Sequence, residues 1–296
     1  MNPPAIRSLI LCLVAASAFP LSILRAEEWP KTGFVLYEEA NSPNGQYGVL
    51  IPNADTEEKD DRMVNYLVDV KGKKLLGKLS AEYIEQANKR SLSVQWADDS
   101  SWAVVVYSDH DLLTSLSLVD IAGAAMKETR MGERIQRDLT ATLGRKPRLD
   151  EASTSAWFRI DSAERKARVR VLETLEGKTE TEDLSYALFQ GTYDVTAKEW
   201  TEANARKLTE ELNSDLSAAF EEESEYESFT AETEQLLDER MNVIYRALRG
   251  TLPAEKFSPV KEAQIAWLKT RDAARGPKKR CELITARIAE LKESLW

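Results

Sequence analysis

The chain has little of what common catalytic sites need. Among its 296 residues there is one histidine, His110, and there are two cysteines. A single histidine excludes a multi-histidine zinc site and makes any histidine-dependent triad rest on His110 itself. The sequence also lacks a P-loop, a Gly-x-Gly-x-x-Gly motif and a Gly-x-Ser-x-Gly motif. We therefore predict a protein that is not an enzyme and that uses no cofactor and no metal.

A long hydrophobic run occurs at the N-terminus. Arg7 precedes an apolar stretch, residues 8–24, and the small residue Ala26 follows it. This order is typical of a secretory signal, and Pro20 and the short length argue against a permanent membrane span. We expect residues 1–26 to be removed, with Ala18 as a second candidate cleavage point. The protein is then expected to be periplasmic or secreted, in a bacterial-type envelope.

The remaining chain is acidic. Removing residues 1–26 takes away Arg7 and Arg25 and no acid, which leaves 38 basic and 50 acidic residues and a net charge near −12. Such a charge disfavours nucleic acid and anionic membranes as partners and suits a cationic protein, although many solubilised domains are simply acidic. One cysteine, Cys281, remains. It is either buried and free or paired between chains, because it has no internal partner.

Residues 27–198 predict an antiparallel β-rich domain. Two polar turns, residues 42–47 and 97–102, each precede an apolar strand and lie 55 residues apart. They resemble the Ser-Pro-Asp-Gly turn of propeller repeats, and residues 156–195 read as a third sheet unit. Three units are too few for a closed propeller, which needs about four blades, so we expect open or two-layer, propeller-like sheets. Residues 126–146 are predicted as a helix between units. The expected strands are 34–37, 47–52, 64–70, 91–96, 102–107, 116–121, 156–160 and 168–172.

Residues 199–296 predict a helical domain of three or four helices, so the whole chain is expected to be an α+β protein. Apolar residues from Leu208 onward recur at helical spacing, and Gly250 and Pro253 end one helical stretch. A second helix is expected from Val260 to about Ala274, and a final one follows Gly276.

Clusters of acidic residues raise two other hypotheses, hydrolysis and calcium binding. Asp109 and Asp111 flank His110, and Asp98 lies beside Asp99, so a hydrolase built on loop acids is one open hypothesis. The commoner explanation for these residues is a solvated loop. Residues 221–227 are rich in glutamate but lack the central glycine of an EF-hand, which favours a solvated helix face over a calcium site.

The C-terminal 60 residues carry the most specific pattern. It consists of Asn-x-x-Tyr ending at Tyr245, Ala-Gln-x-x-Trp-x-x-x-Arg-Asp over residues 263–272, and Cys-x-x-x-Thr-x-Arg over 281–287. Trp267 and Arg271 are four residues apart and share one helix face, from which Arg271 is expected to reach a carboxylate such as Asp238 or Glu290. The pattern resembles the lysozyme inhibitor LprI N-terminal domain family.

This resemblance implies a small, helical, exported domain, with inhibition of lysozyme as one known activity. It also implies a cysteine framework, from which this chain departs at residues 233–236 and 273–275, where the family usually has cysteines. We therefore expect a binding protein, with an inhibitor of a cationic, lysozyme-like hydrolase as the first hypothesis and an envelope scaffold or interaction module as the second. The commoner role for such residues is to hold the helices together. The candidate binding residues are Tyr245, Gln264, Trp267, Arg271, Asp272 and Arg287.

Overall fold

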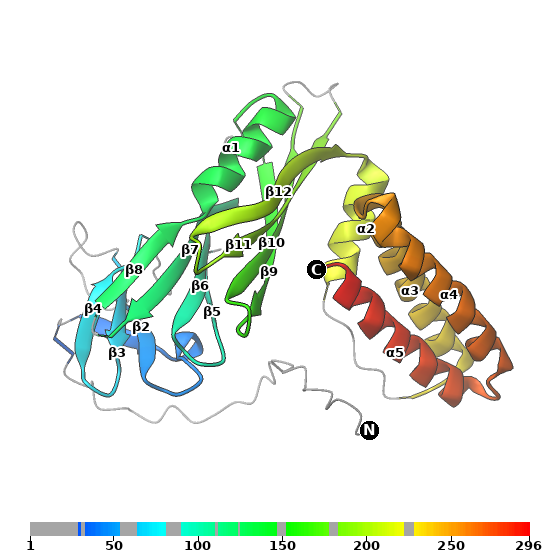
Figure 1. Ribbon diagram of the computed structural model, residues 1–296, viewed down its shortest axis with the longest axis horizontal. Helices are drawn as coiled ribbons and strands as arrows, with labels where there is room; N and C mark the ends of the chain where they lie inside the picture. Colours follow the sequence, from blue (N-terminus) through cyan, green and yellow to red (C-terminus); the bar gives the residue numbers. More distant parts are fainter. Residues whose placement is uncertain are drawn as a thin grey trace.

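The computed structural model shows an α+β protein in which three antiparallel sheets precede a group of helices (Figure 1). It describes residues 29–30, 33–53, 64–80, 90–109, 112–123, 125–146, 152–177, 183–221 and 228–296. The predicted signal, residues 1–26, and the pair His110 and Asp111 lie outside the described residues. Within the described ranges, no helix has the length and apolar character needed to cross a membrane.

Each sheet is a simple meander of four strands, in which every strand pairs with its sequence neighbours. The first sheet contains β1 (Phe34–Tyr37), β2 (Tyr47–Pro52), β3 (Tyr66–Asp69) and β4 (Lys74–Lys78), with a 3-10 turn, η1 (Glu38–Ala40), after β1. The second contains β5 (Arg90–Trp96), β6 (Trp102–Asp109), β7 (Leu112–Ala122) and β8 (Ala125–Arg130). The third contains β9 (Ala152–Asp161), β10 (Lys166–Leu175), β11 (Ser185–Asp194) and β12 (Glu199–Leu208).

The second sheet lies between the other two and is buried on both faces. Val105 and Tyr107 of β6 point into a core shared with Val49 and Leu67 of the first sheet. The alternate residues of β6, such as Val104, enter a second core with the third sheet and helix α1 (Gly132–Leu143). Burial on both sides explains why β6 reads as a continuous apolar run with no alternation.

The C-terminal helices pack against part of the opposite face of the third sheet and extend away from it (Figure 1). Leu172 and Leu188 pack there against a core contributed by α2, α3 and α5. Two threonines cap helix N-termini: Thr209 accepts from the Leu212 amide, and Thr230 accepts from the Thr233 amide. The helices are α2 (Glu210–Phe220), α3 (Ala231–Thr251), α4 (Ala254–Ala273) and α5 (Pro277–Ser294).

The propeller-like turns occupy equivalent places in the sheets. The turn at residues 97–101 joins β5 to β6, and its residue Ser100 has a φ of +59°. The turn before β2 uses Gly45, which has a φ of +63°. The Asn44 amide donates to Ser100 Oγ at 3.3 Å, so the two turns meet. The sheets therefore stack like neighbouring blades without closing a ring.

Two local predictions were wrong. The stretch 126–146 was predicted as one helix, but its first residues form β8 and the helix begins only at Gly132. The helical region was predicted from residue 199, but residues 199–208 form β12. A bulge shifts the register of β12 against Gln190 and Thr192. The bulge breaks the alternation of apolar and polar side chains that marks a strand, which is why the sequence of β12 resembled the helical stretch that follows.

Candidate functional site

Gln264 and Arg287 form the buried centre of the helical region. Both side chains are 6% exposed. The Arg287 Nε donates to Gln264 Oε1 at 2.8 Å, and Nη1 donates to Glu290 Oε2 at 2.7 Å. The Gln264 amide nitrogen lies 3.5 Å from the sulfur of Met241 on α3. Gln264 is the buried residue of α4, so this polar contact joins α4 to α3 and α5.

Trp267 and Arg271 form a second contact, nearer the surface. The Arg271 guanidinium lies 5.5 Å from the centre of a Trp267 ring. Its Nη1 donates to both oxygens of Asp238 on α3 at 2.9 Å, and Nη2 donates to Asp272 at 2.9 Å. Burial opposes the charged form, but the carboxylates of Asp272 and Asp238 outweigh it and raise the pKa of Arg271. The predicted pairing of Arg271 with Asp238 is confirmed, whereas Glu290 pairs with Arg287.

The six candidate binding residues therefore differ in whether a partner protein can reach them. Gln264 and Arg287 are enclosed by the helices and pack the core. Tyr245 is partly buried, with its ring 5.3 Å from that of Phe257. Trp267 and Arg271 are also partly buried, and Asp272 has an exposed side chain. A partner can reach Asp272 and the edges of Tyr245, Trp267 and Arg271.

Two further ion pairs, which no sequence motif predicted, hold the helices together. Arg246 donates to both oxygens of Asp215, which ties α3 to α2. Arg280 donates to both oxygens of Glu234, which ties α5 to the start of α3. These partners are distant in the sequence, so only the helix packing brings them together.

Cys281 is free and fully buried, which decides between the two predicted states. Its sulfur lies 3.9 Å from the carbonyl oxygen of Thr230. Burial, together with the nearby carboxylate of Glu234, raises the pKa of the thiol. The cysteine is therefore a small core residue in this chain.

We expect the Cys281 thiol to resist modification in the folded protein, because the reactive thiolate is both disfavoured and enclosed. A colorimetric thiol reagent at pH 8 should label one thiol per chain in denaturant and almost none in the folded state, when the protein used begins at residue 27. Rapid stoichiometric labelling of the folded protein would show that this part of the helical region opens readily.

An acidic stripe with an apolar centre lies on the first half of α3. Leu236 is 46% exposed, and it lies between Glu232 and Glu239 on the same helix face. Phe229, which is 43% exposed, precedes the helix. We call Glu232, Leu236 and Glu239 the α3 stripe. An exposed leucine flanked by carboxylates is suited to a partner that is apolar at its centre and cationic around it.

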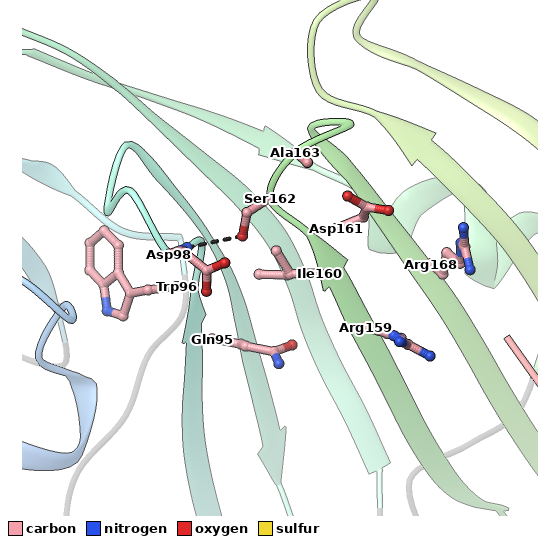
Figure 2. A pocket seen from close by; sticks show the side chains of 9 residues that line it. All are labelled: Gln95, Trp96, Asp98, Arg159, Ile160, Asp161, Ser162, Ala163 and Arg168. Atoms are coloured by element: carbon pink, nitrogen blue, oxygen red, sulfur yellow. Dashed lines mark hydrogen bonds between the residues drawn. The ribbon is translucent and has the colours of Figure 1, made fainter. Parts of the chain in front are cut away.

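A cleft runs along β9, the edge strand of the third sheet, opposite β5, the edge strand of the second. Its polar part encloses about 310 Å³ and its aromatic part about 520 Å³, and the two parts share Gln95. Figure 2 shows the polar part, where the Asp98 amide donates to Ser162 Oγ at 3.0 Å. We call the two parts together the β9 cleft. No short motif marks this cleft in the sequence, because its residues come from separate strands.

The loop acids give no support for hydrolysis. Asp99 accepts from the amide and hydroxyl of Ser101, and these hydrogen bonds lower its pKa. It therefore stabilises the turn as a carboxylate and is poorly suited to act as a general acid. No group of three potential metal ligands gathers within the described ranges. His110, Asp111 and residues 222–227 lie outside them.

The C-terminal region matches a known family. Residues 214–291 match the model of the family described as Lysozyme inhibitor LprI. The matched region begins within α2 and includes α3, α4 and most of α5. This confirms the resemblance found in the sequence and extends it toward the N-terminus. No curated protein matches the chain.

Proposed function

We propose that the chain is an exported binding protein whose helical region inhibits a lysozyme-like cell-wall hydrolase. The observation that carries this proposal is the match of residues 214–291 to a lysozyme inhibitor family. The matched region contains the α3 stripe and the contacts among Trp267, Arg271 and Asp238. The three sheets lie outside the match.

The α3 stripe suits the surface of a cationic hydrolase. Carboxylates such as Glu232 and Glu239 attract a positively charged partner and increase the encounter rate. Leu236 supplies an apolar side chain that gains free energy when the partner removes it from water. Inhibition requires only that the bound helix block access to the catalytic cleft, so the inhibitor itself needs no catalytic residue.

The core contacts prepare this surface for binding. Arg271 holds α4 to Asp238 of α3, and Arg280 holds α5 to Glu234, within one turn of Glu232 and Leu236. A surface that is rigid before binding loses less conformational entropy when the partner docks. In this proposal most of the candidate residues act by positioning α3, and Asp272 is available for direct contact.

The proposal predicts inhibition that weakens with salt. We expect a cationic lysozyme to lose activity at about micromolar concentrations of the protein in low salt, and the apparent affinity to fall by about tenfold near 0.3 M salt. The assay should compare turbidity loss of bacterial cell walls with and without the protein. Absence of inhibition in low salt at tens of micromolar would contradict the proposal. Binding without inhibition would favour an interaction module whose partner is not blocked.

A further inference from the structure

We propose that the β9 cleft binds a glycan that carries carboxylate groups. The cleft is formed by β5, β9 and β10 together with the ends of α2 and α5. Its position differs from that of the α3 stripe, and the proposal does not depend on the inhibitor function. Three features of the cleft support it: an arginine side chain with no partner among the described residues, polar groups that can bind hydroxyls, and an aromatic wall.

Arg168 offers a cationic group to the cleft, whose polar part is lined by Arg159, Asp98 and Asp161 as well. Arg168 lies opposite Arg159 on the neighbouring strand, and its side chain makes no hydrogen bond or ion pair with any described residue. Arg159 is paired with Glu293 at 2.5 Å. Burial and the nearby charges of Arg168 and Arg206 lower the pKa of Arg170 to about 10. A ligand carboxylate would neutralise the charge of Arg168, whose planar guanidinium is suited to bind it with two hydrogen bonds.

The polar groups of the cleft favour a sugar over an acidic peptide. The Asp98 carboxylate has no hydrogen-bond partner among the described residues, and the Gln95 side chain lies beside it in Figure 2. Asp161 lines the same hollow. Free carboxylate and amide oxygens accept hydrogen bonds from hydroxyl groups. A peptide with many carboxylates would be repelled by Asp98 and Asp161, whereas a sugar chain brings many hydroxyls and few charges.

The aromatic part continues from the polar part along β9. Trp157, Phe220 and Trp296 line it and are partly exposed. The rings of Trp157 and Phe220 stack at 4.5 Å, and those of Phe220 and Trp296 meet edge-on at 5.4 Å. The Arg170 guanidinium lies 5.8 Å from the centre of a Trp296 ring, so charge and aromatic surface adjoin. Trp157 and Phe220 cover one face of each other, so a sugar ring would pack against the ring surface that stays partly exposed.

Calorimetric titration of the whole chain tests the proposal with three probes of similar length: a hyaluronan hexasaccharide, neutral chitohexaose and hexaglutamate. We expect the hyaluronan fragment to bind at least about tenfold more tightly than either of the others. Arg168→Gln should weaken that binding by about tenfold. It removes no side-chain hydrogen bond or ion pair with a described residue, so the fold should persist. Arg137→Gln, on the exposed face of α1, is the matched control and should leave binding unchanged.

Four results would overturn the proposal. Equal binding of chitohexaose would show that carboxylates are not recognised, and equal binding of hexaglutamate would favour an acidic peptide. Identical affinities for Arg168→Gln and Arg137→Gln would place the ligand elsewhere. Absence of binding by the hyaluronan fragment at millimolar concentration would also count against the site.

Discussion

Replacing Glu173 with glutamine is expected to stabilise the protein increasingly as the pH rises from 4.5 to 8. Glu173 lies on β10 and is fully buried beneath α1. Neither of its carboxylate oxygens has a hydrogen-bond partner among the described residues. Burial raises its pKa from 4.5 to about 7, and the nearby Gln136 offsets this only in part. The folded protein therefore keeps a proton that the unfolded chain loses.

The sign of the pH effect follows from that difference. Because the pKa of Glu173 is higher in the folded state, the folded protein loses stability as the pH rises through the interval from 4.5 to about 7. The loss is complete above that interval and amounts to about 3 kcal/mol. Glutamine has a similar shape and no charge, so the variant lacks this dependence.

The measurement is the free energy of unfolding by urea for both proteins at several pH values. The difference between Glu173→Gln and the parent should widen by about 3 kcal/mol between pH 4.5 and 8. Glu176→Gln, at an exposed position near the end of the same strand, is the control and should show no such widening. A constant difference for Glu173→Gln across the range would show that the carboxyl group is hydrated or paired.

Arg287→Ala should destabilise the helical region by about 3 kcal/mol or more, because it removes one member of a buried polar contact. The Gln264 oxygen would lose its donor, and the carbonyl oxygen of Val260 would lose a weaker one at 3.4 Å. The truncated side chain would also leave space among α3, α4 and α5. Urea unfolding followed by helical circular dichroism measures the effect.

Arg249→Ala provides the comparison for Arg287→Ala. Arg249 is an exposed arginine of α3, and its removal should change the free energy of unfolding by less than about 0.5 kcal/mol. A loss below about 1 kcal/mol for Arg287→Ala would show that α4 does not depend on this contact.

Sequence patterns predicted the parts of the fold that are governed by local periodicity. The strands around Val49, Val105 and Val169 have strong apolar character, and the structure contains all three. The turns at residues 42–47 and 97–102 correctly indicated repeated sheet units. The spacing of Trp267 and Arg271 predicted a shared helix face, and Asp238 is one of the two carboxylates that were expected as partners of Arg271. Each of these patterns is formed by residues that are close together in the sequence.

The features that were missed depend on distant parts of the chain. The bulge in β12 obscured the alternation around Trp200, and only pairing with β11 fixes that segment as a strand. The β9 cleft combines Gln95 and Asp98 with Arg168, residues that no short motif connects. The burial of Gln264 and Arg287 likewise follows from the packing of α4 and α5, which a list of family positions does not reveal.

The most direct test of an inhibitory α3 surface is to compare Leu236→Asp with Leu184→Asp in the lysozyme assay. The two leucines are 46% and 48% exposed, so both substitutions should preserve the fold, but only Leu236 lies in the α3 stripe. We expect Leu236→Asp to weaken inhibition by about tenfold or more and Leu184→Asp to inhibit like the parent protein. Equal inhibition by both variants, at a concentration where the parent protein is half-effective, would contradict the proposed surface.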